Sequence, residues 1–279
     1  IIYEASKDYN NAFIAYRNAV DIYQEDYLPM FGLDAPEQLQ QDLLRTAHRM
    51  GFTNELQRYE KMLGKTYQPK SNSGGDLVFF WNNGLGPVKS EWSLNFALIR
   101  GRGGAMVFKK KGLDDLSVVR IAFPKYSERI LHFTKASLQL PDRSSRVLEK
   151  AEDVNAIAFQ SLQQRMFKEF STSLLRVALK KASEYGVREK NDDLGAIIGI
   201  VNALTERADT RNWQTIPHTI HYTRAALPTG EQKVKLHLNG KNTTEQEHHL
   251  TYRIQKNRTT FGAFYSLEAT PGYPSYLSY

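Results

Sequence analysis

The hydrophobic pattern of this chain changes near residue 76 from helical to strand-like spacing, and that change limits the folds open to it. Over residues 1–64, apolar residues recur at three- and four-residue spacing, which is typical of helices that bury one face. Residues 65–75 are polar and contain one proline and two adjacent glycines, as a linker does. From Asp76 onward, short apolar runs alternate with turn residues, which indicates strands. The chain is therefore expected to be α+β.

The region after the linker is predicted to be rich in strands, with a helical pair inserted among them. Strands are expected at 77–81, 91–99, 105–109, 117–123, 131–140, 219–225, 232–238, 247–255 and 262–269. Helical spacing returns over 146–185 and 193–208. We therefore predict four parts, which are a helical region at 1–64, a linker at 65–75, an α+β domain at 76–270 and an irregular tail at 271–279.

Charge and cysteine content narrow the classes of function. The 279 residues carry a formal charge of +7, yet Lys109–Lys111 is the only run of three basic residues. A nucleic-acid-binding protein usually concentrates lysine and arginine on one face, so a solvated basic surface is the preferred interpretation and no nucleic-acid partner is expected. Cysteine is absent, which excludes disulfides and thiolate chemistry and fits an oxidising compartment.

The first helical segment contains a motif with a known packing role. Tyr9, Ala12, Tyr16 and Ala19 place small and aromatic residues at helical spacing. This resembles the second helix of a tetratricopeptide repeat, in which such residues let two helices pack closely. The fold expected from it is a repeat-like helical layer followed by the mixed, β-rich domain. A helical hairpin without repeat ancestry is the alternative.

Several stretches together resemble an uncharacterised family of bacterial lipoproteins that contain tetratricopeptide repeats. They are Asp42–Leu44, Gly75–Val78, Asn83–Lys89, Phe123–Tyr126 and Asp209–Pro217. The resemblance implies a periplasmic protein, anchored to the outer membrane by a lipid, that works with other envelope proteins in a complex. Because the chain begins at Ile1 inside an expected helix, we expect the anchor to lie upstream of it.

Two motifs are candidates for an interaction site or a structural corner. Asp209, Arg211 and Trp213 alternate, so in an extended segment their side chains share one side, and Pro217 follows them. They are either a ligand or partner site, or a hydrogen-bonded corner at the start of the next strand. The second motif contains Asn83, Gly84, Gly86, Pro87 and Lys89, and it is predicted to be a turn.

No pattern in the sequence predicts a catalytic, cofactor or metal site. His218 with His221, and His248 with His249, lack the third ligand and the helical spacing that zinc sites use. The chain also lacks a nucleophile elbow and a phosphate-binding loop.

The function expected from the sequence is that of a non-catalytic adaptor, or scaffold, which binds other envelope proteins in outer-membrane or cell-wall assembly. The alternative is an enzyme or binding module that acts on a cell-wall or acidic polymer. Its site would lie near Arg211, Trp213 and His218.

Overall fold

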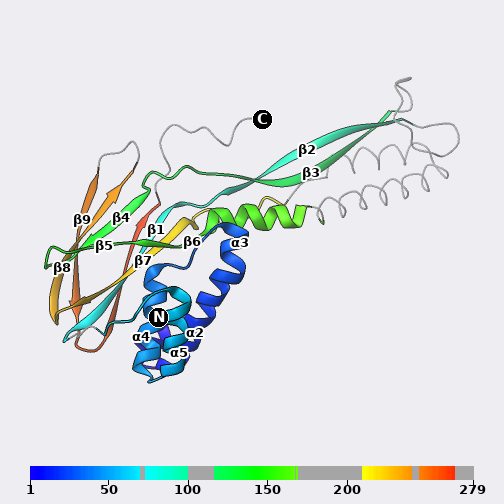
Figure 1. Ribbon diagram of the computed structural model, residues 1–279. Helices are drawn as coiled ribbons and strands as arrows, with labels where there is room; N and C mark the ends of the chain where they lie inside the picture. The colour runs from blue at the N-terminus through cyan, green and yellow to red at the C-terminus, as the bar shows by residue number, and fades with distance from the viewer. Residues whose placement is uncertain (70–72, 100–115, 167, 169–208, 241–244, 268–279) are drawn as a thin grey trace. The chain divides into compact units, whose positions relative to one another are not determined.

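The computed structural model describes residues 1–69, 73–99, 116–166, 168, 209–240 and 245–267 (Figure 1). The chain forms two compact units, and each is described by itself. Unit 1 comprises Ile1–Pro87, Glu128–Ile157 and Gln214–Tyr273, and unit 2 comprises Val88–Ser127, Ala158–Trp213 and Pro274–Tyr279. This division differs from the one expected at residues 65–75, because the first helices and most strands belong to the same unit.

Unit 1 begins with short helices and continues as two four-stranded sheets. Its helical elements are α1 (Ile2–Ala5), α2 (Tyr9–Ile22), the π-helix η1 (Tyr23–Tyr27), α3 (Leu28–Phe31), α4 (Glu37–Arg49) and α5 (Thr53–Leu63). Its strands are β1 (Gly75–Leu85), β4 (Lys135–Gln139), β5 (Ser145–Val147), β6 (Glu149–Asp153), β7 (Pro217–Leu227), β8 (Gly230–Asn239), β9 (Gln246–Ile254) and β10 (Thr259–Ser266). The strand order is β10-β1-β7-β6 in one sheet, here called the helix-side sheet, and β5-β4-β8-β9 in the other, the outer sheet.

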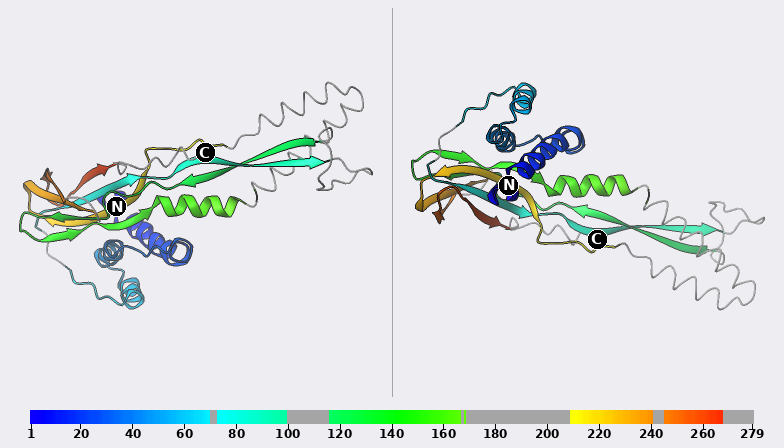
Figure 2. Two further views of the ribbon diagram at one scale, coloured as in Figure 1. Left: turned by 90° about the horizontal axis from the view of Figure 1, so that it is seen from above. Right: turned by 90° about the horizontal axis from the view of Figure 1, so that it is seen from below.

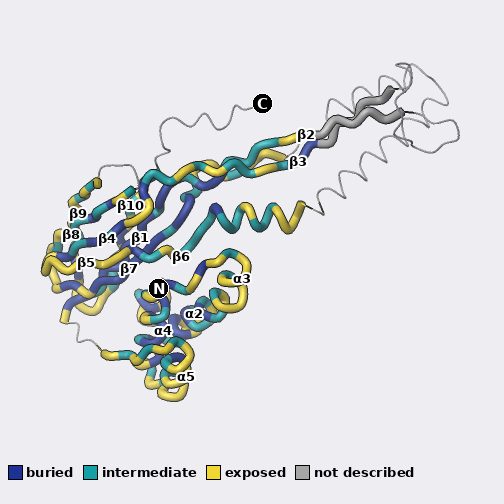
Figure 3. Tube along the Cα trace, turned by 45° about the horizontal axis from the view of Figure 1, so that its top comes forward, coloured by how far each residue is buried: buried dark blue, intermediate teal, exposed yellow. Residues whose placement is uncertain are grey.

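The central strand β1 is buried on both faces, which explains its unbroken apolar run at 77–81. Leu77, Phe79 and Trp81 are fully buried and pack between the two sheets. Val78 and Phe80 point the other way, into a second core shared with α2, α4 and α5. Unit 1 therefore has three layers, with the helix-side sheet in the middle (Figures 1 and 2), and its buried positions lie mainly in the middle of the sheets (Figure 3).

The prediction of a repeat-like helical layer is wrong. Helix α1 is one turn long, and α2 continues into a π-helix, so these elements do not form a repeat hairpin. Ala12 and Tyr16 are indeed buried, but they pack in the core that contains Val78 and Tyr222 of the helix-side sheet. Small and aromatic residues at helical spacing suit close packing on a sheet as well as on another helix, and here they lie in a core shared by the helices and one face of the helix-side sheet.

The π-helix joins the helices to the edge of the helix-side sheet. The hydroxyl of Tyr23 donates to the carbonyl oxygen of Ala151, and that of Tyr27 donates to Glu152 at 3.2 Å. Both acceptors lie in β6, which the sequence had assigned to a helix beginning at 146. The helix begins only at residue 154, after β5 and β6, and the Asp153 side chain accepts from the Ala156 amide at its first turn.

Unit 2 contains a long two-stranded ribbon and the continuation of that helix to residue 166. Strand β2 (Val88–Ile99) pairs with β3 (Leu116–Ser127) in antiparallel register from Val88 opposite Ser127 to Ile99 opposite Leu116. Near the base of the ribbon the Trp92 and Phe123 rings lie 5.0 Å apart. The expected strand at 105–109, helix at 193–208 and tail at 271–279 lie outside the described residues.

We predict that Gly262→Ala destabilises the chain by about 1–3 kcal/mol, the usual cost of overpacking a core. A Cβ at position 262 would lie 2.6 Å from the Tyr252 hydroxyl and 2.8 Å from the Phe79 ring. Urea unfolding followed by circular dichroism measures the change. Ala263→Val, one residue further on the exposed side of β10, is the control and should unfold like the wild type. Equal stability of all three proteins would contradict the tight approach.

Candidate functional site

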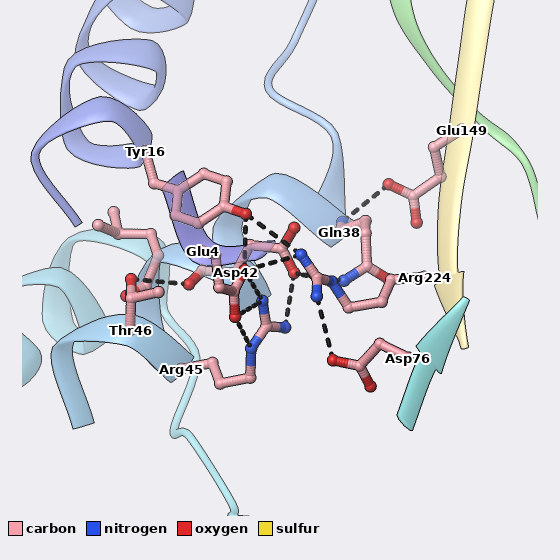
Figure 4. A network of polar contacts seen from close by, with 10 residues as sticks. Glu4, Tyr16, Gln38, Asp42, Arg45, Thr46, Asp76, Glu149 and Arg224 are labelled. Carbon is pink, nitrogen blue, oxygen red and sulfur yellow. Dashed lines mark hydrogen bonds and ion pairs between the residues drawn. The ribbon is translucent and has the colours of Figure 1, made fainter. Parts of the chain in front are cut away.

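The largest group of interacting charged side chains lies between the helices and the helix-side sheet. We call it the buried charge network (Figure 4); its members are Glu4, Tyr16, Asp42, Arg45, Asp76 and Arg224. They come from α1, α2, α4, β1 and β7, so the network joins segments far apart in the sequence. Asp42 is fully buried, and the side chains of Glu4 and Arg224 are at most 5% exposed.

Arg224 is the centre of this network. Its Nη2 donates to Glu4 at 2.8 Å and to the Tyr16 hydroxyl at 3.2 Å. Its Nη1 donates to Asp76 at 3.1 Å, and its Nε lies 3.2 Å from Asp42 Oδ1. One guanidinium therefore links three helices (α1, α2 and α4) and the neighbouring strand β1 to β7.

Arg45 completes the neutralisation of the two buried carboxylates. Its Nη1 donates to Asp42 at 2.7 Å, while Nε and Nη2 donate to Glu4 at 2.8–3.1 Å. The Tyr16 hydroxyl also donates to Glu4, at 2.8 Å. Such charge-assisted, multiply hydrogen-bonded pairs are the arrangement that tolerates burial of ionised groups.

The electrostatics of the network keep its members in fixed protonation states. Burial alone would raise the pKa of Glu4, but Arg45 and Arg224 outweigh it and hold that pKa below its usual value. Burial and the neighbouring Asp42 and Glu4 raise the pKa of the Tyr16 hydroxyl well above its usual range. Near neutral pH Glu4 is therefore ionised and Tyr16 is protonated, so these two groups suit a structural role better than proton transfer.

Sequence reasoning missed the buried charge network. Two of the stretches that carry the family resemblance, Asp42–Leu44 and Gly75–Val78, contribute Asp42 and Asp76 to it. A further signal was available, since the residues next to Arg224 in its own strand are mostly buried. A charged residue in such a strand requires a partner, but the sequence does not say where that partner lies.

The Asp209 motif forms a local, exposed arrangement in unit 2. Asp209 accepts from the backbone amide of Arg211 at 3.1 Å and from its guanidinium Nε at 2.9 Å. These hydrogen bonds lower the pKa of Asp209 to about 2. The Arg211 side chain is 90% exposed and Trp213 is 71% exposed. Pro217 belongs to unit 1, where it begins β7 opposite Leu85.

The turn motif at 83–89 forms the end of β1 and the start of β2. Asn83 is buried, donates to the Phe133 carbonyl at 2.9 Å and accepts from Ser266 at 3.1 Å. Gly84 has a φ of +61°, and a Cβ there would lie 2.4 Å from Leu131. Gly86 donates to the carbonyl of Ile216 at 2.7 Å. Pro87 is the last residue of the first segment of unit 1, and Lys89 lies in β2 opposite Tyr126.

The histidines of β7 lie on opposite faces of the strand. His218 is buried, and its Nε2 lies 3.3 Å from Glu128. His221 packs against Trp81 with ring centroids 4.7 Å apart and ring planes tilted by 39°, and its ring nitrogens contact the Leu148 carbonyl and the Thr219 hydroxyl. Among the described residues, no group of three His, Asp or Glu side chains is arranged to hold a metal ion.

A different surface presents exposed aromatic side chains. Phe261, Ala263 and Tyr265 alternate along β10, and we call them the edge stripe. Phe261 is 47% exposed and Tyr265 is 63% exposed. The register places Phe261 beside Val78 and Ala263 beside Phe80. On β1 the helical core covers this face of the sheet, whereas on β10 the same face is exposed.

The edge stripe was also missed at the level of sequence, although its strand was expected at 262–269. The alternation of Phe261, Ala263 and Tyr265 is also typical of a buried face, so the pattern alone does not indicate that this face is exposed. Within the parts of the chain that the structure describes, no helix is long and apolar enough to cross a membrane.

Comparison with known protein families, with curated proteins and with solved structures found no match.

We predict that Arg224→Met lowers the free energy of unfolding by about 3–5 kcal/mol, because it removes one of the two arginines that neutralise the buried carboxylates of Glu4 and Asp42. Arg211→Met is the matched control, since the ion pair of Arg211 with Asp209 is exposed, and it should leave the stability unchanged. Urea titration of the three proteins at pH 7 measures both effects. A small loss for Arg224→Met would show that the helices are held by apolar contacts alone.

A second prediction concerns pH. Burial lowers the pKa of His221 from 6.5 to about 4, so the folded protein favours the neutral ring. Between these values the unfolded chain binds more protons. The contribution of the neutral His221 ring to the free energy of unfolding is therefore complete above pH 6.5. About 3 kcal/mol of this free energy is lost as the pH falls through 4.

His221→Gln should remove this pH dependence. Its free energy of unfolding, measured by urea titration from pH 7 to pH 4, should fall less steeply than that of the wild type. Val147→Ser, which replaces an exposed, non-titrating side chain on β5, should keep the wild-type slope. Parallel curves for the wild type and His221→Gln would contradict the low pKa.

Proposed function

We propose that this chain is a non-catalytic adaptor that binds another protein through the edge stripe. The observation that carries the proposal is the exposure of Phe261 and Tyr265 on a strand at the edge of a sheet. Aromatic side chains are enriched among the residues that dominate the binding free energy of protein interfaces.

The buried charge network supports a non-catalytic role. Its arginines and carboxylates are directed at one another, since Nη1 and Nη2 of Arg224 donate to residues of the network and its Nε lies 3.2 Å from Asp42. The charged groups therefore serve the contact between helices and sheet.

The proposal for the cellular setting rests on the sequence alone. The family resemblance and the absence of cysteine support a periplasmic adaptor, anchored to the outer membrane, that acts in outer-membrane or cell-wall assembly. Its partners are then other envelope proteins in a multi-protein complex.

A second candidate function is binding of a cell-wall or acidic polymer near Arg211 and Trp213. The observation that favours it is the exposure of the Trp213 indole close in sequence to a charged guanidinium. His218 is buried against Glu128, so we do not include it in such a surface.

We predict that changing the edge stripe removes a protein partner. The protein in its native, anchored form is cross-linked in its own envelope, purified, and its companions are identified by mass spectrometry. The wild type should recover one stoichiometric partner. Phe261→Ser/Tyr265→Ser should recover at least about tenfold less, because each aromatic contact at an interface centre is worth 1 kcal/mol or more.

The matched control is Val147→Ser, which removes an exposed apolar side chain from β5, an edge strand of the outer sheet. It should recover the partner as the wild type does. If the wild type brings down no protein, or if the double variant retains the partner, the adaptor proposal fails. Recovery of polymer fragments alone would favour the second candidate.

A further inference from the structure

Among the strands that the structure describes, none pairs with the outer side of β10, and the backbone groups on that side belong to the residues that form the edge stripe. The Asp76 amide donates to the carbonyl of Arg258, so at residue 258 the backbone faces β1. Backbone groups alternate in direction along a strand, and hence 260, 262 and 264 also face β1 while 259, 261, 263 and 265 face outward. In the described part of the chain, no strand pairs with this outer side.

The other edges of the two sheets in unit 1 carry features that discourage strand addition. Strand β6 has a register shift between Lys150 and Glu152 and bears four charged residues among its five. Strand β5 is three residues long, and β9 exposes Glu247 and Arg253. Bulges, charges and short length are the usual means by which an edge avoids pairing with another chain.

Strand β10 carries none of these features. It pairs in continuous register with β1 from Thr259 to Ser266, and it contains no proline and no charged residue. A long, regular and uncharged edge is a template for another strand. The flanking exposed aromatic side chains of Phe261 and Tyr265 would lie beside the side chains of such a strand.

The charge around β10 indicates what kind of segment would pair with it. Lys256 and Arg258 are exposed in the turn that leads into the strand, and residues 255–267 contain no acidic side chain. The nearby carboxylate of Asp76 is engaged by Arg224. A partner with acidic residues at the end that lies beside this turn would therefore complement the edge.

We propose that β10 binds an extended segment of a partner protein as an additional, antiparallel strand, with acidic residues at the C-terminal end of that segment beside Lys256 and Arg258. Backbone hydrogen bonds to residues 259–265 would supply affinity, and the edge stripe with the two basic residues would supply selectivity. This inference rests on the proposed function and specifies its partner.

The test uses a synthetic probe. It is a fluorescein-labelled ten-residue peptide in which valine and threonine alternate and which ends in Asp-Glu, compared with the same peptide ending in Lys-Lys. Fluorescence anisotropy at low salt should show micromolar binding of the acidic peptide and at least tenfold weaker binding of the basic one. Absence of binding of the acidic peptide to the wild type would overturn the proposal.

Ala263→Pro is the decisive variant. It removes one outward amide without removing a hydrogen bond to β1, since proline is tolerated on an edge strand at such a position. We expect at least tenfold weaker binding of the acidic peptide, whereas Val147→Ser, on the edge strand β5 of the outer sheet, should bind it as the wild type does. Equal binding by Ala263→Pro would overturn strand addition.

A second variant keeps the proposal falsifiable if Ala263→Pro fails to fold. Lys256→Glu/Arg258→Glu should bind the acidic peptide at least tenfold more weakly, and Lys233→Glu on the exposed side of β8 should not. Equal loss in both would overturn the placement of the acidic end. A wild-type chain that dimerises in sedimentation through β10 would show that the occupant is a second copy, which also overturns the proposal.

The outcomes separate this inference from the adaptor function. A native partner that depends on Phe261 and Tyr265 but is retained by Ala263→Pro would leave the adaptor function standing and remove strand addition.

Discussion

The burial of β1 on both faces is the constraint on which unit 1 depends. A strand with Leu77, Phe79 and Trp81 on one side and Val78 and Phe80 on the other needs an apolar cover on each side. The outer sheet covers one face and the helices cover the other. The first helices consequently form part of the same folded unit, and they have no separate core of their own. Their apolar side chains pack against one another and, through Val78 and Tyr222, against β1 and β7.

The helix-to-sheet contact is not purely apolar, and its polar part selects one arrangement. Apolar packing is non-directional, so Val78 and Tyr222 alone would accept several positions of α2 and α4. Arg224 is compatible with few positions of the helices, because its guanidinium must contact Glu4, Asp42 and Asp76 at the same time. Desolvation offsets much of the attraction in such a cluster. We therefore interpret its main effect as fixing the register of the helices on the sheet, with a smaller net gain in stability.

Local pattern predicted the strands around β1 and β7 to β10 well, because each is bounded by turn residues and alternates or runs apolar. Prediction from local pattern was wrong where one sequence pattern is compatible with two structures. Ala12 and Tyr16 suit a helix that packs on a helix or on a sheet, and the sequence does not show which surface is present. The segment at 146–153 has helical spacing but pairs as β5 and β6, since the neighbouring strands offer it hydrogen-bonding edges. The buried charge network was out of reach for a related reason, as Glu4 and Arg224 stand 220 residues apart.

The same packing that buries β1 also makes β10 a rigid edge. Gly262 lets Tyr252 approach closely, and Ser266 accepts a hydrogen bond from the Trp81 indole at 2.8 Å while donating to Asn83. These contacts fix the inward side of β10 to the core between the sheets, and they leave Phe261 and Tyr265 exposed on a strand that is already straight and ordered. A partner that adds to such an edge does not have to order it, so less of the interaction free energy is lost to conformational entropy. An exposed aromatic pair on a mobile loop would lack this advantage, which is the physical reason to place the binding surface on β10.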